Sequence, residues 1–277
     1  MVRLARLTRL RGAWDYVYGT FRIRRILLLV LVALSVALGP FLFFLPYGLR
    51  IGLIYVYAGT ISITGFFMYG AFRNTLKSAI GSIFLGWRYK PREFTPEQYA
   101  TFGVAQILND MGIRKKVTIC QTANPWIEGP FTNALTNKVY IPVSWLKKFP
   151  APQDMRGVLG HELGHVKTKG KFGRESLLGM GGVVGLSLLV GLFSIQLVTE
   201  TFELALAFLV LTALSWRNER RADMEGARVT GPEGLISVFE QLAAESKRDD
   251  GSETHPPLRD RILRLSKLLD IRSGMNI

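Results

Sequence analysis

Four long apolar runs, whose single charged residue is Glu203 in the fourth, constrain this chain more than any other feature of its sequence. The runs cover residues 26–45, 51–72, 177–198 and 202–216. About 20 apolar residues in a helix cross the hydrocarbon core of a bilayer, so the first three runs are long enough and the fourth is short. The runs predict two transmembrane hairpins, at 26–72 and 176–216, and hence a multi-pass membrane protein with four transmembrane helices.

Basic residues gather beside these runs and predict how the chain is oriented. The net charge is +14 although 48% of the residues are hydrophobic. Residues 1–25 hold seven arginines and one acid, which is typical of a basic interfacial segment on anionic lipid; a mitochondrial transit peptide is the alternative. Lysine and arginine flank the runs mainly on one side, which predicts the cell membrane with both termini and the soluble parts cytoplasmic. Because the basic residues lie beside apolar runs, nucleic acid is not expected as a partner.

The soluble parts, 73–175 and 217–277, are expected to form one domain that is mainly α-helical with a small β-sheet. A helix is predicted from Thr95 to Met111, with Thr95 as its N-cap. Residues 116–121 are predicted to form a strand. Residues 138–146 alternate in polarity but contain Pro142, which cannot donate to a central ladder, so an edge strand is predicted there. Two later helices are expected at 232–246 and 258–271.

The five residues His161-Glu162-Leu163-Gly164-His165 predict a metal site on a helix that covers about 153–167. Positions four apart share one helix face, so His161 and His165 direct two imidazoles toward one zinc ion. Glu162 lies about 100° around the helix, beside the metal but not bound to it. A general base for metal-assisted hydrolysis is expected at that position.

Two histidines leave a zinc site with one protein ligand missing, which the stretch 218–223 is expected to supply. Glu219 and Asp223 are four residues apart and share a helix face. Glu219 is therefore the leading candidate for the third ligand, and Asp223 is expected to accept a hydrogen bond from a ligand histidine. Glu225 and Glu175 compete with Glu219 on spacing alone.

Three motifs in this order resemble those of the HtpX-type membrane zinc peptidases, whose wider family includes the CAAX prenyl endopeptidases. The motifs are H-E-L-G-H, then E-x-x-A-D-x-x-G-A from 219 to 227, then T-H-P-P-L-x-x-R-I from 254 to 262. The resemblance implies one zinc ion per chain in a gluzincin-type site, held by His161, His165 and Glu219. It also implies Glu162 as the base and Asp223 as the supporting acid.

The resemblance also assigns His255 to the active site, where its imidazole would stabilise an oxyanion or orient substrate. HtpX-type proteins carry an Asn-Ala-aromatic stretch on the strand that borders the cleft. Here the order differs, with proline after Asn124 and a second Asn-Ala pair at 133–134. The predicted edge strand at 136–143 is expected to bind an extended substrate by adding it to the sheet.

These expectations predict a zinc metalloendopeptidase that is integrated in the lipid bilayer and cleaves membrane proteins near the cytoplasmic surface, in quality control. A CAAX-type processing peptidase and a non-catalytic membrane scaffold are the alternatives. An intramembrane site-2-type protease is disfavoured, because charged residues such as Asp154, Arg156 and Lys167 flank the H-E-L-G-H motif.

Overall fold

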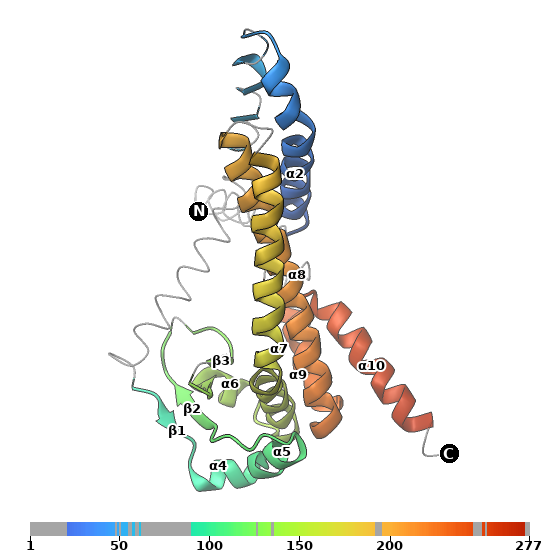
Figure 1. The fold of residues 1–277 in the computed structure, drawn as a ribbon. Coiled ribbons are helices and arrows are strands. Elements are labelled where there is room, and N and C mark those ends of the chain that lie inside the picture. The colour runs from blue at the N-terminus through green and yellow to red at the C-terminus, as the bar shows by residue number, and fades with distance from the viewer. Residues whose placement is uncertain are drawn as a thin grey trace, which may run out of the picture. The chain divides into compact units, whose positions relative to one another are not determined.

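The computed structural model divides into two compact units, which Figure 1 shows as one ribbon. The apolar unit comprises Met1–Thr75 and Arg174–Leu214, and the mixed unit comprises Leu76–Gly173 and Ser215–Ile277. The described residues are 21–47, 49, 51–54, 57–58, 61, 90–125, 127–133, 136–191, 196–245, 251–252 and 254–274. The predicted interfacial segment 1–25 and the second predicted span 51–72 therefore lie largely outside the described residues.

The apolar unit contains α2 (Phe21–Phe44) and the apolar stretches of two longer helices, α7 (Pro152–Gly191) and α8 (Gln196–Thr230). A small core buries Leu28, Leu31, Tyr57, Val198 and Ala205. Other large apolar side chains of this unit are exposed, including three leucines that are 68–75% exposed: Leu177, Leu188 and Leu204. Outward-facing leucines of this kind are typical of helices that contact lipid.

Within the described residues, two of the four predicted spans are helices that are long and apolar enough to cross a membrane. These are Pro152–Val190 and Val198–Thr230, while the apolar stretch Arg25–Ala37 of α2 is shorter. The third span was predicted to continue to Val198, but α7 ends at Gly191 and Val198 lies in α8. The fourth span begins earlier than predicted, so its apolar helix is longer than the sequence indicated.

The mixed unit contains a four-stranded sheet with the strand order β1-β2-β4-β3. The strands are β1 (Arg92–Glu93), β2 (Thr118–Thr122), β3 (Phe131–Asn133) and β4 (Lys138–Pro142). β2 and β4 are parallel, and the outer strands β1 and β3 each run antiparallel to their neighbour. The structure thus confirms the prediction of a mainly α-helical chain with a small β-sheet.

The prediction that residues 138–146 form an edge strand was wrong. β4 lies between β2 and β3, so β3 is the edge strand on that side of the sheet and β1 is the edge strand on the other. Pro142 is compatible with this inner position because it is the last residue of β4 and the N-cap of α6 (Val143–Lys148), where the strand needs no further donor. The sequence did not reveal β3 because it has only three residues.

Two short helices, α4 (Pro96–Thr101) and α5 (Val104–Asp110), replace the single helix predicted for 95–111. Thr95 caps α4 as predicted, with a reciprocal capping box to Gln98. The break falls at Gly103, which adopts a left-handed conformation (φ 61°) that glycine tolerates best.

The helix that carries H-E-L-G-H begins at Pro152, close to the predicted start, but it does not end near Lys167. α7 is 40 residues long in total and continues past Lys167, through a polar stretch of lysines and glycines, into the apolar run. Hydrophobicity changes along this stretch, but no proline interrupts the backbone hydrogen bonds, so the helix persists.

The core of the mixed unit lies where the sheet and α5 pack against α7, α9 (Glu233–Glu245) and α10 (Leu258–Gly274). In Figure 1 the strands, drawn in green, lie on one side of the lower part of α7, and α9 and α10 lie on the other. The fully buried members include Ile107, Ile119, Ile141, Leu159, Leu163, Leu235 and Leu265. The last two helices match the predicted ranges 232–246 and 258–271 to within three residues.

Candidate metal centre and active site

α7 places His161 and His165 one turn apart on a single face. Their Nε2 atoms lie 3.2 Å apart, and both side chains are at most 16% exposed. The other nitrogen of each ring has its own partner: Nδ1 of His161 lies 2.8 Å from Asp223 Oδ1, and Nδ1 of His165 lies 3.0 Å from the Asn218 amide. Because the carboxylate accepts from Nδ1 of His161, Nε2 of that ring remains as a ligand atom, and Nε2 of His165 faces the same point.

α8 adds Glu219 to the same point. Glu219 Oε1 lies 3.1 Å from His165 Nε2, and Oε2 lies 3.6 Å from His161 Nε2. His161, His165 and Glu219 form a group that could hold a metal ion among the described residues. The predicted competitor Glu225 lies elsewhere, in ion pairs with Lys167 and Arg228.

The three ligand atoms fit a zinc ion. With zinc–ligand bonds of about 2.0–2.1 Å in a tetrahedron, neighbouring ligand atoms lie roughly 3.3 Å apart. The two Nε2 atoms lie 3.2 Å apart, and each lies 3.1 or 3.6 Å from a different oxygen of the Glu219 carboxylate. One ligand atom from each of the three residues lies within 4.8 Å of the other two. Glu219 Oε2 is also buried and has no hydrogen-bond partner, although Arg261 lies 3.3 Å away. Two facing imidazole lone pairs and a buried carboxylate oxygen repel one another unless a cation is shared between them.

Asp223 joins His161 to a buried cation, Arg261, which is the arginine of the third motif and was a weaker candidate than His255 from the sequence. Arg261 of α10 donates two hydrogen bonds to the Asp223 carboxylate, at 2.8 and 2.5 Å, and its guanidinium lies 4.1 Å from the centre of the Phe239 ring. Burial by itself would lower the pKa of Arg261, but the Asp223 carboxylate raises it, so the guanidinium stays charged. The only signal in the sequence was its place six residues after His255 in the third motif.

Glu219 and Asp223 follow the apolar stretch of α8, and both remain charged in spite of burial. Burial alone would raise the pKa of Glu219, but the hydrogen bond with His165 and the surrounding imidazoles lower it. In the same way, Arg261 outweighs burial and lowers the pKa of Asp223. With the two imidazoles neutral, as in metal ligands, two carboxylates and one guanidinium thus carry one excess negative charge in a buried space, which favours a bound cation.

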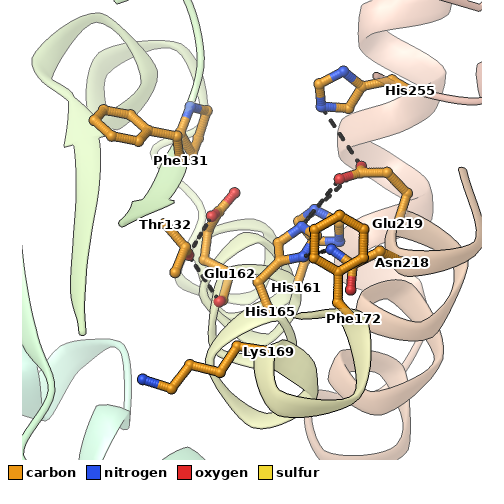
Figure 2. A pocket seen from close by; sticks show the side chains of 11 residues that line it. Phe131, Thr132, His161, Glu162, His165, Lys169, Phe172, Asn218, Glu219 and His255 are labelled. Carbon is orange, nitrogen blue, oxygen red and sulfur yellow. Dashed lines mark hydrogen bonds and ion pairs between the residues drawn. The ribbon is translucent and has the colours of Figure 1, made fainter. Parts of the chain in front are cut away.

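Glu162 points to the other side of the cluster, toward the edge strand β3 (Figure 2). Its carboxylate oxygen Oε2 accepts a hydrogen bond from Thr132 Oγ1 at 2.7 Å, and the same hydroxyl lies 2.9 Å from the Glu162 backbone carbonyl. Sequence reasoning missed Thr132, because nothing local to it indicates that β3 reaches α7. The contact joins the strand that borders the pocket to the predicted general base.

His255 lies near the cluster, as predicted, but it is less enclosed than the other two histidines. Its Nε2 lies 3.6 Å from Glu219 Oε2, while its side chain is 58% exposed. The Thr254 hydroxyl lies 2.8 Å from His255 Nδ1. The third histidine of the chain therefore stands at the opening of the site.

A pocket of about 300 Å³ brings these groups together. Figure 2 shows that its residues come from β3, α7, α8 and the turn before α10. The lining consists of Pro130, Phe131, Thr132, His161, Glu162, His165, Lys169, Phe172, Asn218, Glu219 and His255. Asp223 and Arg261 do not line the pocket, but both contact His161.

The site is of the metallopeptidase type. Two histidines and a glutamate form a cluster, and a second glutamate and a short strand border the same pocket. The profile of peptidase family M48 matches residues 121–269, more than half of the chain. The chain therefore belongs to peptidase family M48 and is a metalloprotease by family, as its HtpX-type motifs predicted.

One curated protein and one solved structure are similar to the chain at lower levels. The chain is 29% identical to a protein named Protease HtpX homolog from Desulforapulum autotrophicum, in an alignment that covers 44% of this chain and 53% of the relative. The chain thus spans about half the length of the curated relative it matches. Among solved structures it is similar to the crystal structure of S. mikatae Ste24p, with 14% identity, a TM-score of 0.44 and coverage of 72% of this chain and 57% of that one.

Proposed function

We propose that this protein is a zinc endopeptidase of the membrane, with one zinc ion held by His161, His165 and Glu219. The observation that carries the proposal is the cluster of His161, His165 and Glu219, whose ligand atoms lie within 4.8 Å of one another, beside a glutamate placed for general-base catalysis. When bound there, zinc would act as a Lewis acid on the scissile carbonyl and would lower the pKa of water.

The chain's own residues supply the proton transfers. The Glu162 carboxylate takes a proton from the attacking water and then delivers it to the leaving amine. Thr132 holds one of the two carboxylate oxygens at 2.7 Å and so leaves the other free for the water. His255, which reaches the pocket on the Glu219 side, donates toward the oxyanion that forms at the carbonyl.

Substrate is proposed to lie along β3, the edge strand, and not along β4. β4 is paired on both sides, so its backbone groups are already used in the sheet. Phe131 and Thr132 of β3 both line the pocket, and a peptide that adds to this edge would pass the cluster.

The substrate class follows from the short chain segments between the ligands and the apolar runs. His165 precedes the run that starts at Leu177 by twelve residues, and Glu219 follows Trp216 by three. The two apolar helices support association with a membrane. We therefore expect cleavage of membrane proteins near the cytoplasmic surface, in quality control. A substrate that is cleaved equally well after removal of its membrane segment would contradict this placement.

The decisive experiment compares wild type with Glu162→Gln for cleavage of a membrane-protein substrate, with zinc content measured on both. Glu162→Gln is expected to lower kcat by at least roughly a thousandfold and to retain zinc. Glu225→Gln is the matched control, since this glutamate makes only ion pairs outside the pocket. Equal cleavage by wild type and Glu162→Gln would favour a non-catalytic scaffold, and cleavage restricted to prenylated C-terminal peptides would favour CAAX-type processing.

A further inference from the structure

One face of α8 carries more than the metal site. Ser215, Glu219 and Asp223 follow one another at intervals of four residues, so they share a face. The Ser215 hydroxyl donates to the Thr254 backbone carbonyl at 2.9 Å. The indole Nε1 of Trp216, next to Ser215, donates to the Ser252 carbonyl at 2.7 Å. The first turn of this face therefore holds the segment that carries His255.

That segment is a compact turn with hydrogen bonds of its own. The backbone N–H of Ser252 donates to the His255 carbonyl at 2.7 Å, and the N–H of His255 donates to the Ser252 hydroxyl at 3.0 Å. Gly251 opens the turn with a φ of +74°, and a Cβ there would lie 2.9 Å from the His255 carbonyl. The turn is thus tightly closed, and a movement of Ser252 or Thr254 moves His255 with it.

The His255 ring has little packing of its own to fix its position. Its side chain is 58% exposed and lies 3.6 Å from Glu219, beyond hydrogen-bond distance. The two bonds from α8 hold the carbonyls of Ser252 and Thr254, and Thr254 directly precedes His255 in the chain. They place the ring relative to Glu219, because donors and ligand belong to the same helix.

We propose that Trp216, supported by Ser215, is a positioning residue for catalysis that acts through His255. The proposal rests on the proposed function, since it requires that His255 take part in the reaction. The indole bond joins a rigid, planar donor on α8 to the turn. Loss of a hydrogen bond costs little stability, but a displacement of about 1 Å at a catalytic group can cost up to roughly a hundredfold in rate.

The test measures kcat and KM of full-length protein in detergent for Trp216→Phe, Ser215→Ala and His255→Ala, and for each α8 variant combined with His255→Ala. Trp216→Phe keeps the aromatic ring and removes the donor. It is expected to lower kcat by roughly tenfold with KM and zinc content unchanged, and Ser215→Ala by a smaller factor. In the His255→Ala background both changes are expected to have no further effect on kcat, because the ring that they position is gone.

Trp145→Phe is the matched control. Its indole Nε1 also donates to a backbone carbonyl, that of Glu128, at 2.8 Å, but it does not touch the His255 turn. We expect Trp145→Phe to change kcat by the same factor in the wild-type background and in the His255→Ala background. A factor for Trp216→Phe that is equally large in both backgrounds would overturn the proposal and assign Trp216 a merely structural role.

A second readout does not depend on activity. Amide hydrogen exchange in peptides that cover 251–257 is expected to be faster in Trp216→Phe than in wild type, with the rest of the mixed unit unchanged. Unchanged exchange and unchanged kcat would overturn the positioning role alone. Full activity of His255→Ala would instead show that His255 takes no part in the reaction. The proposed hydrolase function would still be tested separately by Glu162→Gln.

Discussion

The helices α7 and α8 meet in two different ways in the two units. In the mixed unit glycines touch backbone: a Cβ on Gly164 would lie 2.7 Å from the Ala222 carbonyl oxygen, and a Cβ on Gly226 would lie 2.6 Å from the Gly160 carbonyl carbon. In the apolar unit a Cβ on Gly179 meets only side chains, those of Val210 and Leu214, at 3.0 and 3.1 Å. Gly181 and Gly185 have no atom of the described residues within 4 Å of such a Cβ.

The difference follows from what each stretch must hold. Ligand atoms 3.1–3.6 Å apart tolerate little movement between the helices that carry them, so backbone packs on backbone beside the site. In the apolar unit the two helices need only complementary packing surfaces, and the side chains between them provide these. Gly181 and Gly185 have the G-x-x-x-G spacing, which is compatible with close helix approach and equally with glycines that only loosen a lipid-facing helix. Among the described residues, the close approach occurs at Gly164 instead.

Gly164→Ala is the largest expected effect that tests this comparison. A methyl group at this position overlaps the backbone of Ala222, which cannot rotate away, so we expect a loss of about 3 kcal/mol in the free energy of unfolding together with weaker zinc binding. The thermal unfolding midpoint and the zinc content of the purified protein measure both.

The matched control for Gly164→Ala is Gly181→Ala on the same helix. With open space around it, alanine is expected to leave stability unchanged or raise it by about 1 kcal/mol or less through its higher helix propensity. If Gly164→Ala and Gly181→Ala changed stability and zinc content equally, the close contact between α7 and α8 at Gly164 would not be what holds the metal site together.

Within the tight stretch, the two ligand histidines differ in their outer partners. His161 is held by Asp223, which Arg261 pairs in turn, while His165 is held by the neutral amide of Asn218. Charge-assisted hydrogen bonds are roughly twice as strong as neutral ones. We expect Asp223→Asn to weaken zinc affinity by about a hundredfold and Asn218→Ala by about tenfold, as measured by competition with a chelator. A larger loss for Asn218→Ala would reverse this order.

The smallest expected effect lies in the apolar unit. Tyr57 is 1% exposed, and its hydroxyl lies 2.5 Å from the Ser35 hydroxyl. Tyr57→Phe keeps the ring and leaves Ser35 its bond to the Leu31 carbonyl, so we expect a loss of about 1 kcal/mol in stability and unchanged zinc content. Tyr47→Phe, at a side chain that is 77% exposed, is the control and should change neither. If Tyr57→Phe lost zinc, packing in the apolar unit would affect the metal site, contrary to the comparison between the two units.

Sequence reasoning located most of the candidate site but assigned the sheet partly wrongly. Spacing by four residues predicted a His161–His165 face and a Glu219–Asp223 face, and the resemblance to HtpX-type peptidases predicted that the two faces form one site. The structure brings these four residues close together. It placed the edge of the sheet at 138–146 because Pro142 was taken as interior to a strand, whereas Pro142 ends β4. It also missed the break at Gly103, where a single glycine in a helical pattern carries no clear signal by itself.

The sequence by itself determined the features that depend on helix geometry, because positions three or four residues apart share a face in any helix. These are the two-histidine face of α7, the Glu219–Asp223 face of α8 and the long apolar runs. Only the tertiary structure decided which side chains from distant segments complete the site. Thr132 reaches Glu162 across 30 residues and Arg261 reaches Asp223 across 38, and contacts at such separations depend on how the strand and the last helix pack, which no local pattern encodes.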